Sequence, residues 1–158
     1  MKKQTEEIIN ILKSNNQTIS FAESCTGGRI AAEFTAIAGV SSVFNGSCVT
    51  YSNEIKHLWL GVSQELLDDF GAVSAECVKS MLSGIAKKSR SDYAIAVSGI
   101  AGPDGGTASK PVGTTYIGIL TPEGTIVQKF RFDGDREAVQ NQAKEAAITL
   151  LKKFLTKC

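Results

Sequence analysis

The chain has 158 residues, of which 42% are hydrophobic and 21% are charged, and its formal net charge is +1. This balance excludes a broad basic surface for nucleic acid or anionic lipid, and no apolar run approaches the roughly 18 residues of a membrane span. The length suits one domain with a substantial core, so we expect a single domain over 1–158. The N-terminal residues lead into an amphipathic helix rather than a signal peptide, so we expect a cytoplasmic protein.

Hydrophobic spacing predicts alternating helices and strands along the whole chain. Helical segments repeat apolar residues every three to four positions, whereas strands are short apolar or alternating runs. In order, the predicted elements are a helix over 5–13, a strand over 18–22, a helix over 28–37, a strand over 47–51, short helices after Ser52 and Ser63, a helix over 74–88, a strand over 93–97, strands over 113–120 and 124–132, and a helix over 136–155.

Turn residues mark the boundaries between these elements. Ser52 and Ser63 are typical helix N-caps, and Thr-Pro-Glu-Gly at 121–124 is typical of a β-hairpin. The helix after Ser63 is expected to bury Leu66, Leu67 and Phe70. Strands that alternate with helices, with one added hairpin, predict an α/β (α+β) three-layer sandwich with a mixed β-sheet and helices on both faces.

Cysteine and histidine content argues against a metal site. The cysteines are Cys25, Cys48, Cys77 and Cys158, without a C-x-x-C pair, and His57 is the single histidine. A structural zinc site needs more closely spaced ligands, so we expect no metal. Because the sequence carries no export signal, we expect free thiols rather than disulfides.

The most informative stretch is Phe-Ala-Glu-Ser-Cys-Thr-Gly-Gly at 21–28, between a predicted strand and a predicted helix. A turn here would present backbone N–H groups and a small nucleophile, Ser24, at a helix N-terminus, where an anion is favoured. The alternative is that Ser24 or Thr26 is only an N-cap, and that Gly27 and Gly28 only fit a tight turn.

Lys56 is the candidate base, because it falls in the first turn of the helix after the next strand. A cation there opposes the helix dipole, and desolvation or nearby cations would lower its pKa further. A neutral lysine can take the proton of a serine nucleophile. Tyr51 could relay that proton or be an inward strand residue, and Lys56 could be a solvated surface lysine.

Two further segments could bind an anion. The glycine-rich loop over 98–111 could bring backbone amides close to a ligand, although it matches no nucleotide-binding motif and could be a plain surface loop. Arg131 and Arg136 could clamp a phosphate, with Asp135 as an N-cap, or could form surface ion pairs. The serine, the lysine and the glycine loop all follow predicted strands, so we expect one shared ligand site.

A series of motifs runs in order over nearly the whole chain. They are AESCTGG at 22–28, VTYSN at 49–53 followed by Lys56, GAVS at 71–74, SGIAGPDGG at 98–106, KPVGT at 110–114 and GDR at 134–136. Together they resemble the CinA C-terminal domain family, which includes stand-alone nicotinamide-nucleotide amidohydrolases. The resemblance implies hydrolysis of the carboxamide of nicotinamide mononucleotide to nicotinate mononucleotide and ammonia, without a cofactor. It implies Ser24 as nucleophile, Lys56 as base and Tyr51 as an assisting residue.

The same resemblance assigns residues to substrate binding. Backbone N–H groups around Cys25, Thr26 and Gly27 would hold the oxyanion, and Arg136 with the glycine loop would hold the ribose and the 5′-phosphate. The loop residues implied are Gly99, Ala101, Gly102, Gly105, Gly106 and Thr107. One position departs from the family pattern, because Gln140 stands where members commonly have arginine.

Two alternatives remain open from the sequence. Cys25 could be the nucleophile with His57 as its base, or the chain could be a non-catalytic nucleotide-binding module with a regulatory, competence-related role. The expected partner is a small-molecule nucleotide, without nucleic acid or membrane. We also expect a homo-oligomer, a dimer or larger, paired through the long C-terminal helix.

Overall fold

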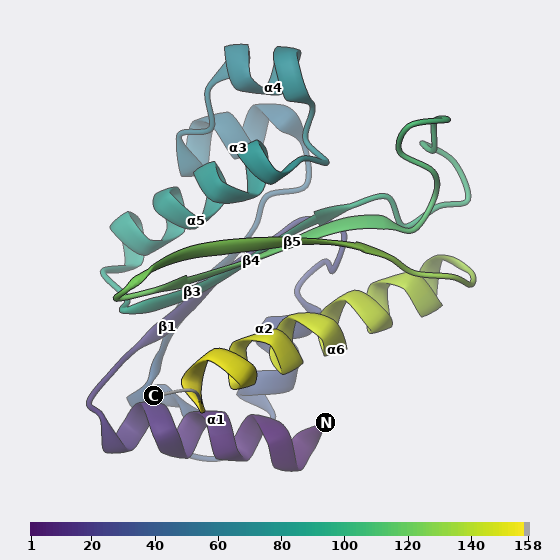
Figure 1. Cartoon of the computed structure of the whole chain (residues 1–158). Helices are drawn as coiled ribbons and strands as arrows, with labels where there is room; N and C mark the ends of the chain where they lie inside the picture. The colour runs from purple at the N-terminus through teal and green to yellow at the C-terminus, as the bar shows by residue number, and fades with distance from the viewer. Residues whose placement is uncertain (157–158) are drawn as a thin grey trace.

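A computed structural model describes residues 1–156 (Figure 1). Its elements are α1 (Lys2–Ser14), β1 (Ile19–Glu23), α2 (Arg29–Thr35), the 3₁₀ helix η1 (Val40–Ser42), β2 (Phe44–Val49), α3 (Asn53–Leu60), α4 (Gln64–Phe70), α5 (Ala75–Ser89), β3 (Tyr93–Gly99), β4 (Thr114–Thr121), β5 (Gly124–Arg131) and α6 (Arg136–Leu155). Cys158, expected as a free thiol, lies outside the described residues. No helix within 1–156 is long and apolar enough to cross a bilayer.

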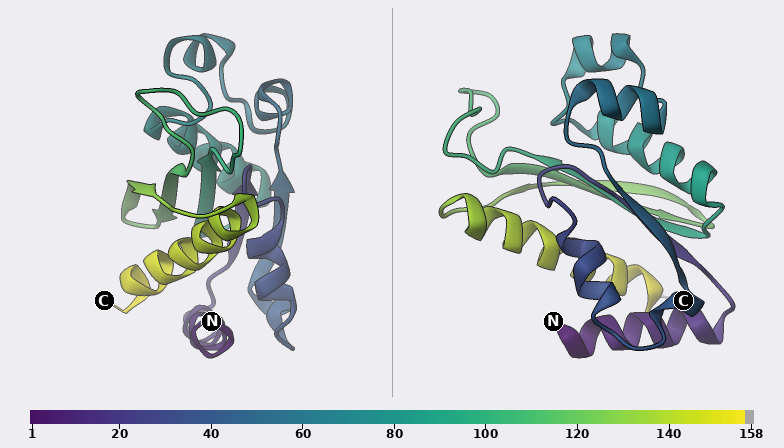
Figure 2. Two further views of the ribbon diagram at one scale, coloured as in Figure 1. Left: turned by 90° about the vertical axis from the view of Figure 1, so that its right-hand side faces the viewer. Right: turned by 180° about the vertical axis from the view of Figure 1, so that it is seen from behind.

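The strands form one mixed five-stranded sheet in the order β2-β1-β3-β4-β5. β1 pairs in parallel with β2 and with β3, whereas β3–β4 and β4–β5 are antiparallel. Helices α3, α4 and α5 cover one face, and α1, α2 and α6 cover the other (Figures 1 and 2). The predicted three-layer fold with a mixed sheet is therefore confirmed. The parallel strands β1, β2 and β3 all end at the same edge of the sheet.

Side-chain size differs between the two faces of the sheet. In β1 and β3, large residues such as Phe21 and Ile95 join the core cluster under α1, α2 and α6, whereas Ala22 and Ala96 face the helices of the other layer. Gly118 of β4 extends this small surface, because a Cβ there would lie 2.6 Å from Val78 Cγ1 of α5. The small residues allow α5 to pack close to the central strands.

The three predicted N-caps, Ser52, Ser63 and Asp135, are confirmed, and Ser74 is a fourth N-cap that was not predicted from the sequence. The side chains of Ser52, Ser63, Ser74 and Asp135 accept hydrogen bonds from backbone N–H groups of α3, α4, α5 and α6. Each cap satisfies a donor that the first helical turn leaves without a partner.

Two predictions about individual elements are wrong. The second strand covers Phe44–Val49 rather than 47–51, because its pairing with β1 runs from Phe44, opposite Ile19, to Val49, opposite Glu23. The Phe44 ring also stacks on Phe21, with ring centroids 5.0 Å apart. Tyr51 therefore lies beyond the strand and is not an inward strand residue. Phe70, predicted in the core, is the last residue of the short helix α4 and is 48% exposed, whereas Leu67 of the same helix is buried.

Candidate active site

The carboxyl edge of the parallel strands gathers the candidate residues. Ser24 follows β1, Tyr51 follows β2, and the glycine loop follows β3. Arg136 begins α6, whose N-terminal end lies beside that loop (Figure 1). The sequence expectation that these segments meet at one edge is confirmed by hydrogen bonds between them.

Glu23, the last residue of β1, organises the turn that carries Ser24. Its side chain is fully buried. Oε2 accepts hydrogen bonds from Thr26 Oγ (2.7 Å) and from the N–H groups of Gly28 (3.0 Å) and Ile30 (3.1 Å). Oε1 accepts from the N–H of Ala31 at 2.9 Å. The carboxylate thus satisfies the N-terminal donors of α2 and lies at the positive end of the helix.

This arrangement corrects two sequence interpretations. The anion that occupies the N-terminus of α2 is the protein's own Glu23, so the N–H groups of Gly28, Ile30 and Ala31 do not face a ligand. Neither Ser24 nor Thr26 is the N-cap of α2, because Gly28 occupies that position and the side chain of Glu23 accepts the hydrogen bonds of the first turn. This role of Glu23 was not predicted from the sequence, because its side chain meets the following helix only in the folded chain.

Of the three N–H groups predicted to hold an oxyanion, Gly27 already has an acceptor within the turn. Gly27 N–H donates to Ser24 O at 3.0 Å, which removes it from the predicted set. Within residues 1–156, the N–H groups of Cys25 and Thr26 make no hydrogen bond to another residue. Gly27 and Gly28 have φ angles of +57° and +95°, so the prediction that they fit a tight turn is confirmed.

Lys56 and Ser24 form a buried pair. Lys56 is 1% exposed and Ser24 is 7% exposed. Lys56 Nζ lies 3.0 Å from Ser24 Oγ, 2.8 Å from the carbonyl oxygen of Thr50 and 3.1 Å from that of Tyr51. No carboxylate forms an ion pair with it in the described chain. Lys56 is therefore not the solvated surface lysine of the alternative reading.

The contacts of Lys56 suit a proton acceptor. Burial lowers the pKa of Lys56, since the charged form loses its hydration. Two of its three polar neighbours are carbonyl oxygens, which can only accept hydrogen bonds. A neutral amine would direct its two N–H bonds at these carbonyls, so its lone pair would face the hydroxyl of Ser24.

Arg136 connects the dyad to the glycine loop. Its Nη1 donates to the carbonyl oxygen of Gly102 at 2.7 Å, and its Nη2 donates to Tyr51 Oη at 2.6 Å. Tyr51 is 55% exposed. It contacts Lys56 through its carbonyl oxygen and Arg136 through its hydroxyl. Arg131 is exposed at the end of β5 and shares no hydrogen bond with this cluster among residues 1–156.

Packing inside the loop accounts for several of its glycines. A Cβ at Gly99 would lie 2.6 Å from Thr115 Oγ, and Cβ atoms at Gly102 and Gly106 would lie 2.5 Å and 2.8 Å from atoms of Val112. Thr107 is engaged in a turn with Lys110, because its N–H donates to the Lys110 carbonyl at 2.8 Å. These glycines allow the two arms of the loop to approach each other, so internal packing is one reason why this loop is rich in glycine.

The alternative pair of Cys25 and His57 is not assembled. Burial raises the pKa of the Cys25 thiol to about 12, which disfavours the thiolate. His57 Nδ1 lies 2.7 Å from the carbonyl oxygen of Val62, at the far end of α3. Gln140 donates from Nε2 to the carbonyl oxygen of Cys25 at 3.0 Å, so it fixes the nucleophile turn to α6. The described residues contain no group of three or more potential metal ligands.

Comparison with known proteins places this chain in a family. The model of the CinA C-terminal domain matches residues 1–155. A CinA-like protein of Fervidobacterium nodosum is 46% identical over 99% of this chain, and one of Endomicrobium trichonymphae is 52% identical over 92%. The chain spans 38% and 34% of the lengths of these two relatives.

Solved structures indicate the same family as the relatives found by sequence. A competence-damaged protein (CinA) superfamily protein of Klebsiella pneumoniae superposes with a TM-score of 0.95 at 36% identity, covering 99% of this chain and 98% of that one. The competence/damage inducible protein CihA of Agrobacterium tumefaciens gives 0.93 at 38% identity, covering 98% and 94%. This chain therefore belongs to the CinA C-terminal domain family.

Proposed function

We propose that this protein hydrolyses the carboxamide of nicotinamide mononucleotide to nicotinate mononucleotide and ammonia, with Ser24 as nucleophile and Lys56 as general base. The observation that carries this proposal is the 3.0 Å contact between Ser24 Oγ and the buried amine of Lys56. A buried lysine without a carboxylate partner supports proton transfer rather than an ion pair. The motif resemblance supplies the substrate class.

The geometry supports a two-step acyl transfer. Neutral Lys56 would accept the Ser24 proton as Oγ attacks the carboxamide carbon, and the N–H groups of Cys25 and Thr26 would hold the oxyanion. The resulting ammonium would donate a proton to the amide nitrogen, so ammonia leaves and an ester forms on Ser24. Water would then attack the ester with Lys56 again as base, and the proton would return to Ser24 as the acid leaves.

The carbonyl groups around Lys56 would stabilise both the charged and the neutral form of its amine during this reaction. Each proton transfer creates an ammonium in a buried place, which is costly without hydrogen-bond acceptors. The carbonyl oxygens of Thr50 and Tyr51 already lie within 3.1 Å of Nζ. They would stabilise the ammonium when it forms and would orient the lone pair when it is neutral.

Arg136 supports a nucleotide as the substrate rather than a neutral amide. Two of its guanidinium N–H groups donate to Gly102 and Tyr51. The others have no acceptor within residues 1–156, so they would be available to a 5′-phosphate. Because Tyr51 contacts both Lys56 and Arg136, it would fix the distance between the reacting end and the phosphate end of the substrate.

Replacing Arg136 tests this assignment of the substrate. We expect Arg136→Leu to raise KM for nicotinamide mononucleotide by about 10- to 100-fold, because charge-assisted hydrogen bonds to phosphate would be lost. KM for nicotinamide riboside, which lacks the phosphate, should change little. Ammonia release at varied substrate concentration measures both. Arg131→Leu is the matched control and should behave as wild type. An equal effect of Arg136→Leu on nucleotide and riboside would contradict the phosphate role.

A further inference from the structure

Exposed large apolar side chains concentrate in one segment of the chain. Within residues 1–156, those exposed are Met1, Val49, Tyr51, Leu58, Trp59 and Phe70. All except Met1 lie between 49 and 70, from the end of β2 to the end of α4. Exposed apolar side chains mark interaction sites where they gather on a surface, and aromatic residues are enriched in the centres of protein interfaces.

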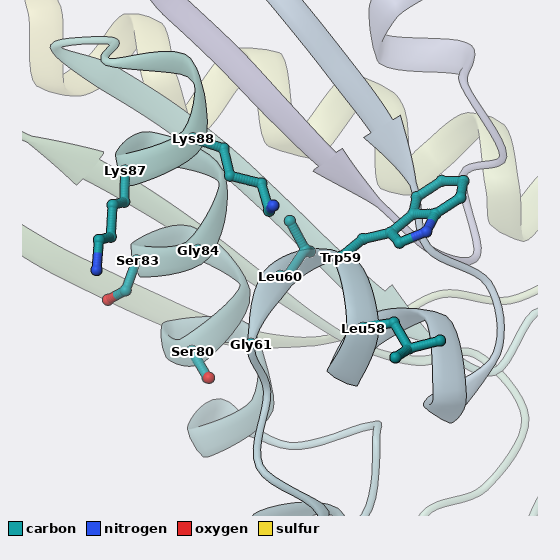
Figure 3. Close-up of a pocket in the computed structure, with 9 residues that line it drawn as sticks. All are labelled: Leu58, Trp59, Leu60, Gly61, Ser80, Ser83, Gly84, Lys87 and Lys88. Atoms are coloured by element: carbon teal, nitrogen blue, oxygen red, sulfur yellow. The ribbon is translucent and has the colours of Figure 1, made fainter.

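A groove of about 620 Å³ opens between α3 and α5, and two residues of this segment, Leu58 and Trp59, are among those that line it (Figure 3). Leu58 and Trp59 lie on its α3 side, and Lys87 and Lys88 lie on its α5 side. The two helices meet at Gly84, where a Cβ would overlap the backbone of Leu60. The groove therefore combines apolar walls with two exposed cations.

Helix α4 carries the opposite charges on the same layer of the molecule. Glu65, Asp68 and Asp69 are exposed, and Phe70 at the end of the helix is 48% exposed. α3, α4 and α5 all cover one face of the sheet (Figure 1). This face thus holds an acidic helix that ends on an exposed aromatic ring, together with a basic groove that has apolar walls.

We propose that this face binds a second copy of the chain, with Asp68, Asp69 and Phe70 of each copy docked on the groove that carries Lys87 and Lys88 of the other. A patch with both halves of a complementary pair can meet itself about a twofold axis, which is the commonest arrangement of homo-oligomers. The acidic residues of α4 would repel a nucleic acid or an anionic membrane. A second copy would pair its lysines with the acidic residues of α4, and its own acidic residues with the lysines of the groove.

This surface differs from the C-terminal helix that the sequence suggested for pairing. The apolar residues of α6, including Val139, Ala147 and Leu151, are buried within their own chain. Among the described residues, none of the large exposed apolar side chains lies on α6, whereas a stable interface needs about 800 Å² on each side. The 49–70 segment supplies the exposed aromatic anchors that α6 lacks.

Sedimentation of charge-reversed variants of the full chain tests the proposal. We expect wild type to form dimers between about 1 and about 100 µM. The double variants Lys87→Glu/Lys88→Glu and Asp68→Lys/Asp69→Lys should each weaken self-association by about 100-fold, since like charges then oppose each other. An equimolar mixture of the two should dimerise again, because each acidic site then meets a basic one.

A matched control makes an equal change in net charge on the other face of the sheet. Lys3→Glu/Lys153→Glu reverses two exposed lysines of α1 and α6 and should dimerise as wild type does. Thermal unfolding of every variant verifies that it is folded. A wild type that stays monomeric at about 100 µM, double variants that assemble like wild type, or a mixture that stays monomeric would each overturn the proposal.

Discussion

Replacing Lys56 with methionine is expected to lower kcat for ammonia release from nicotinamide mononucleotide by about 10²- to 10⁴-fold, the range for loss of a general base. Methionine keeps much of the volume of the buried side chain but cannot accept the Ser24 proton. Binding of the nucleotide should persist, because Arg136 and the glycine loop are unchanged. Kinetics with separate measurement of the dissociation constant distinguish the two effects.

The pH dependence of the rate identifies the group that titrates. Burial lowers the pKa of Lys56, so its neutral form appears at a lower pH than in a solvated lysine. In wild type we expect kcat/KM to rise with pH up to this lowered pKa and then to level off. The residual activity of Lys56→Met should lack this rise. His57→Gln, which changes an exposed neighbour on α3, should keep the wild-type profile.

The free energy of unfolding should also depend on pH in the direction that the lowered pKa of Lys56 dictates. Between the lowered pKa of folded Lys56 and the ordinary value near 10.4, the unfolded chain binds the proton and the folded chain does not. The free energy of unfolding contributed by Lys56 therefore rises with pH in this window and is flat below it. Urea unfolding over a pH series should lose this slope in Lys56→Met. The same slope in both proteins would contradict a lowered pKa.

Replacing Glu23 with alanine should destabilise the protein by about 3–5 kcal/mol, because several buried donors would lose their acceptor together. These donors are Thr26 Oγ and the N–H groups of Gly28, Ile30 and Ala31. We also expect kcat to fall, since the turn that carries Ser24 would no longer be fixed. Glu23→Gln should lose less stability, because its amide oxygen remains an acceptor. Urea unfolding and ammonia release measure both effects.

Glu33→Ala is the matched control for this prediction. Glu33 also lies on α2, but it is partly exposed and forms a 3.3 Å ion pair with Lys144. Surface ion pairs of this kind contribute at most about 1 kcal/mol. If Glu23→Ala lost no more stability than Glu33→Ala, the buried carboxylate would not be the organising group of the nucleophile turn.

Much of this architecture could be predicted from local patterns in the sequence. Ser52, Ser63 and Asp135 are caps that act within a few residues, so the sequence alone indicated three helix starts. The meeting of Ser24 and Lys56 at one edge followed from the rule that parallel strands end together. Their direct contact needed the tertiary structure, because it joins residues that are 32 positions apart.

Other features depend on contacts that no local pattern reports. The Glu23 side chain turns back onto a helix that follows it, and the bond from Arg136 to Tyr51 spans 85 positions. The loop glycines pack against Val112 and Thr115, which looks in the sequence like a ligand-binding pattern. Phe70 has a helical core spacing, yet α4 is too short and too peripheral to bury it.

Ammonia release from nicotinamide mononucleotide by chelator-treated protein tests the central claim most directly, with wild type, Ser24→Ala and Cys25→Ala measured side by side. We expect wild type to release one ammonia for each nicotinate mononucleotide formed. Cys25→Ala should keep most of this activity, and Ser24→Ala should bind the nucleotide but release none. A folded wild type that binds the nucleotide without turnover, or a Ser24→Ala variant that retains wild-type release, would contradict the Ser24–Lys56 mechanism.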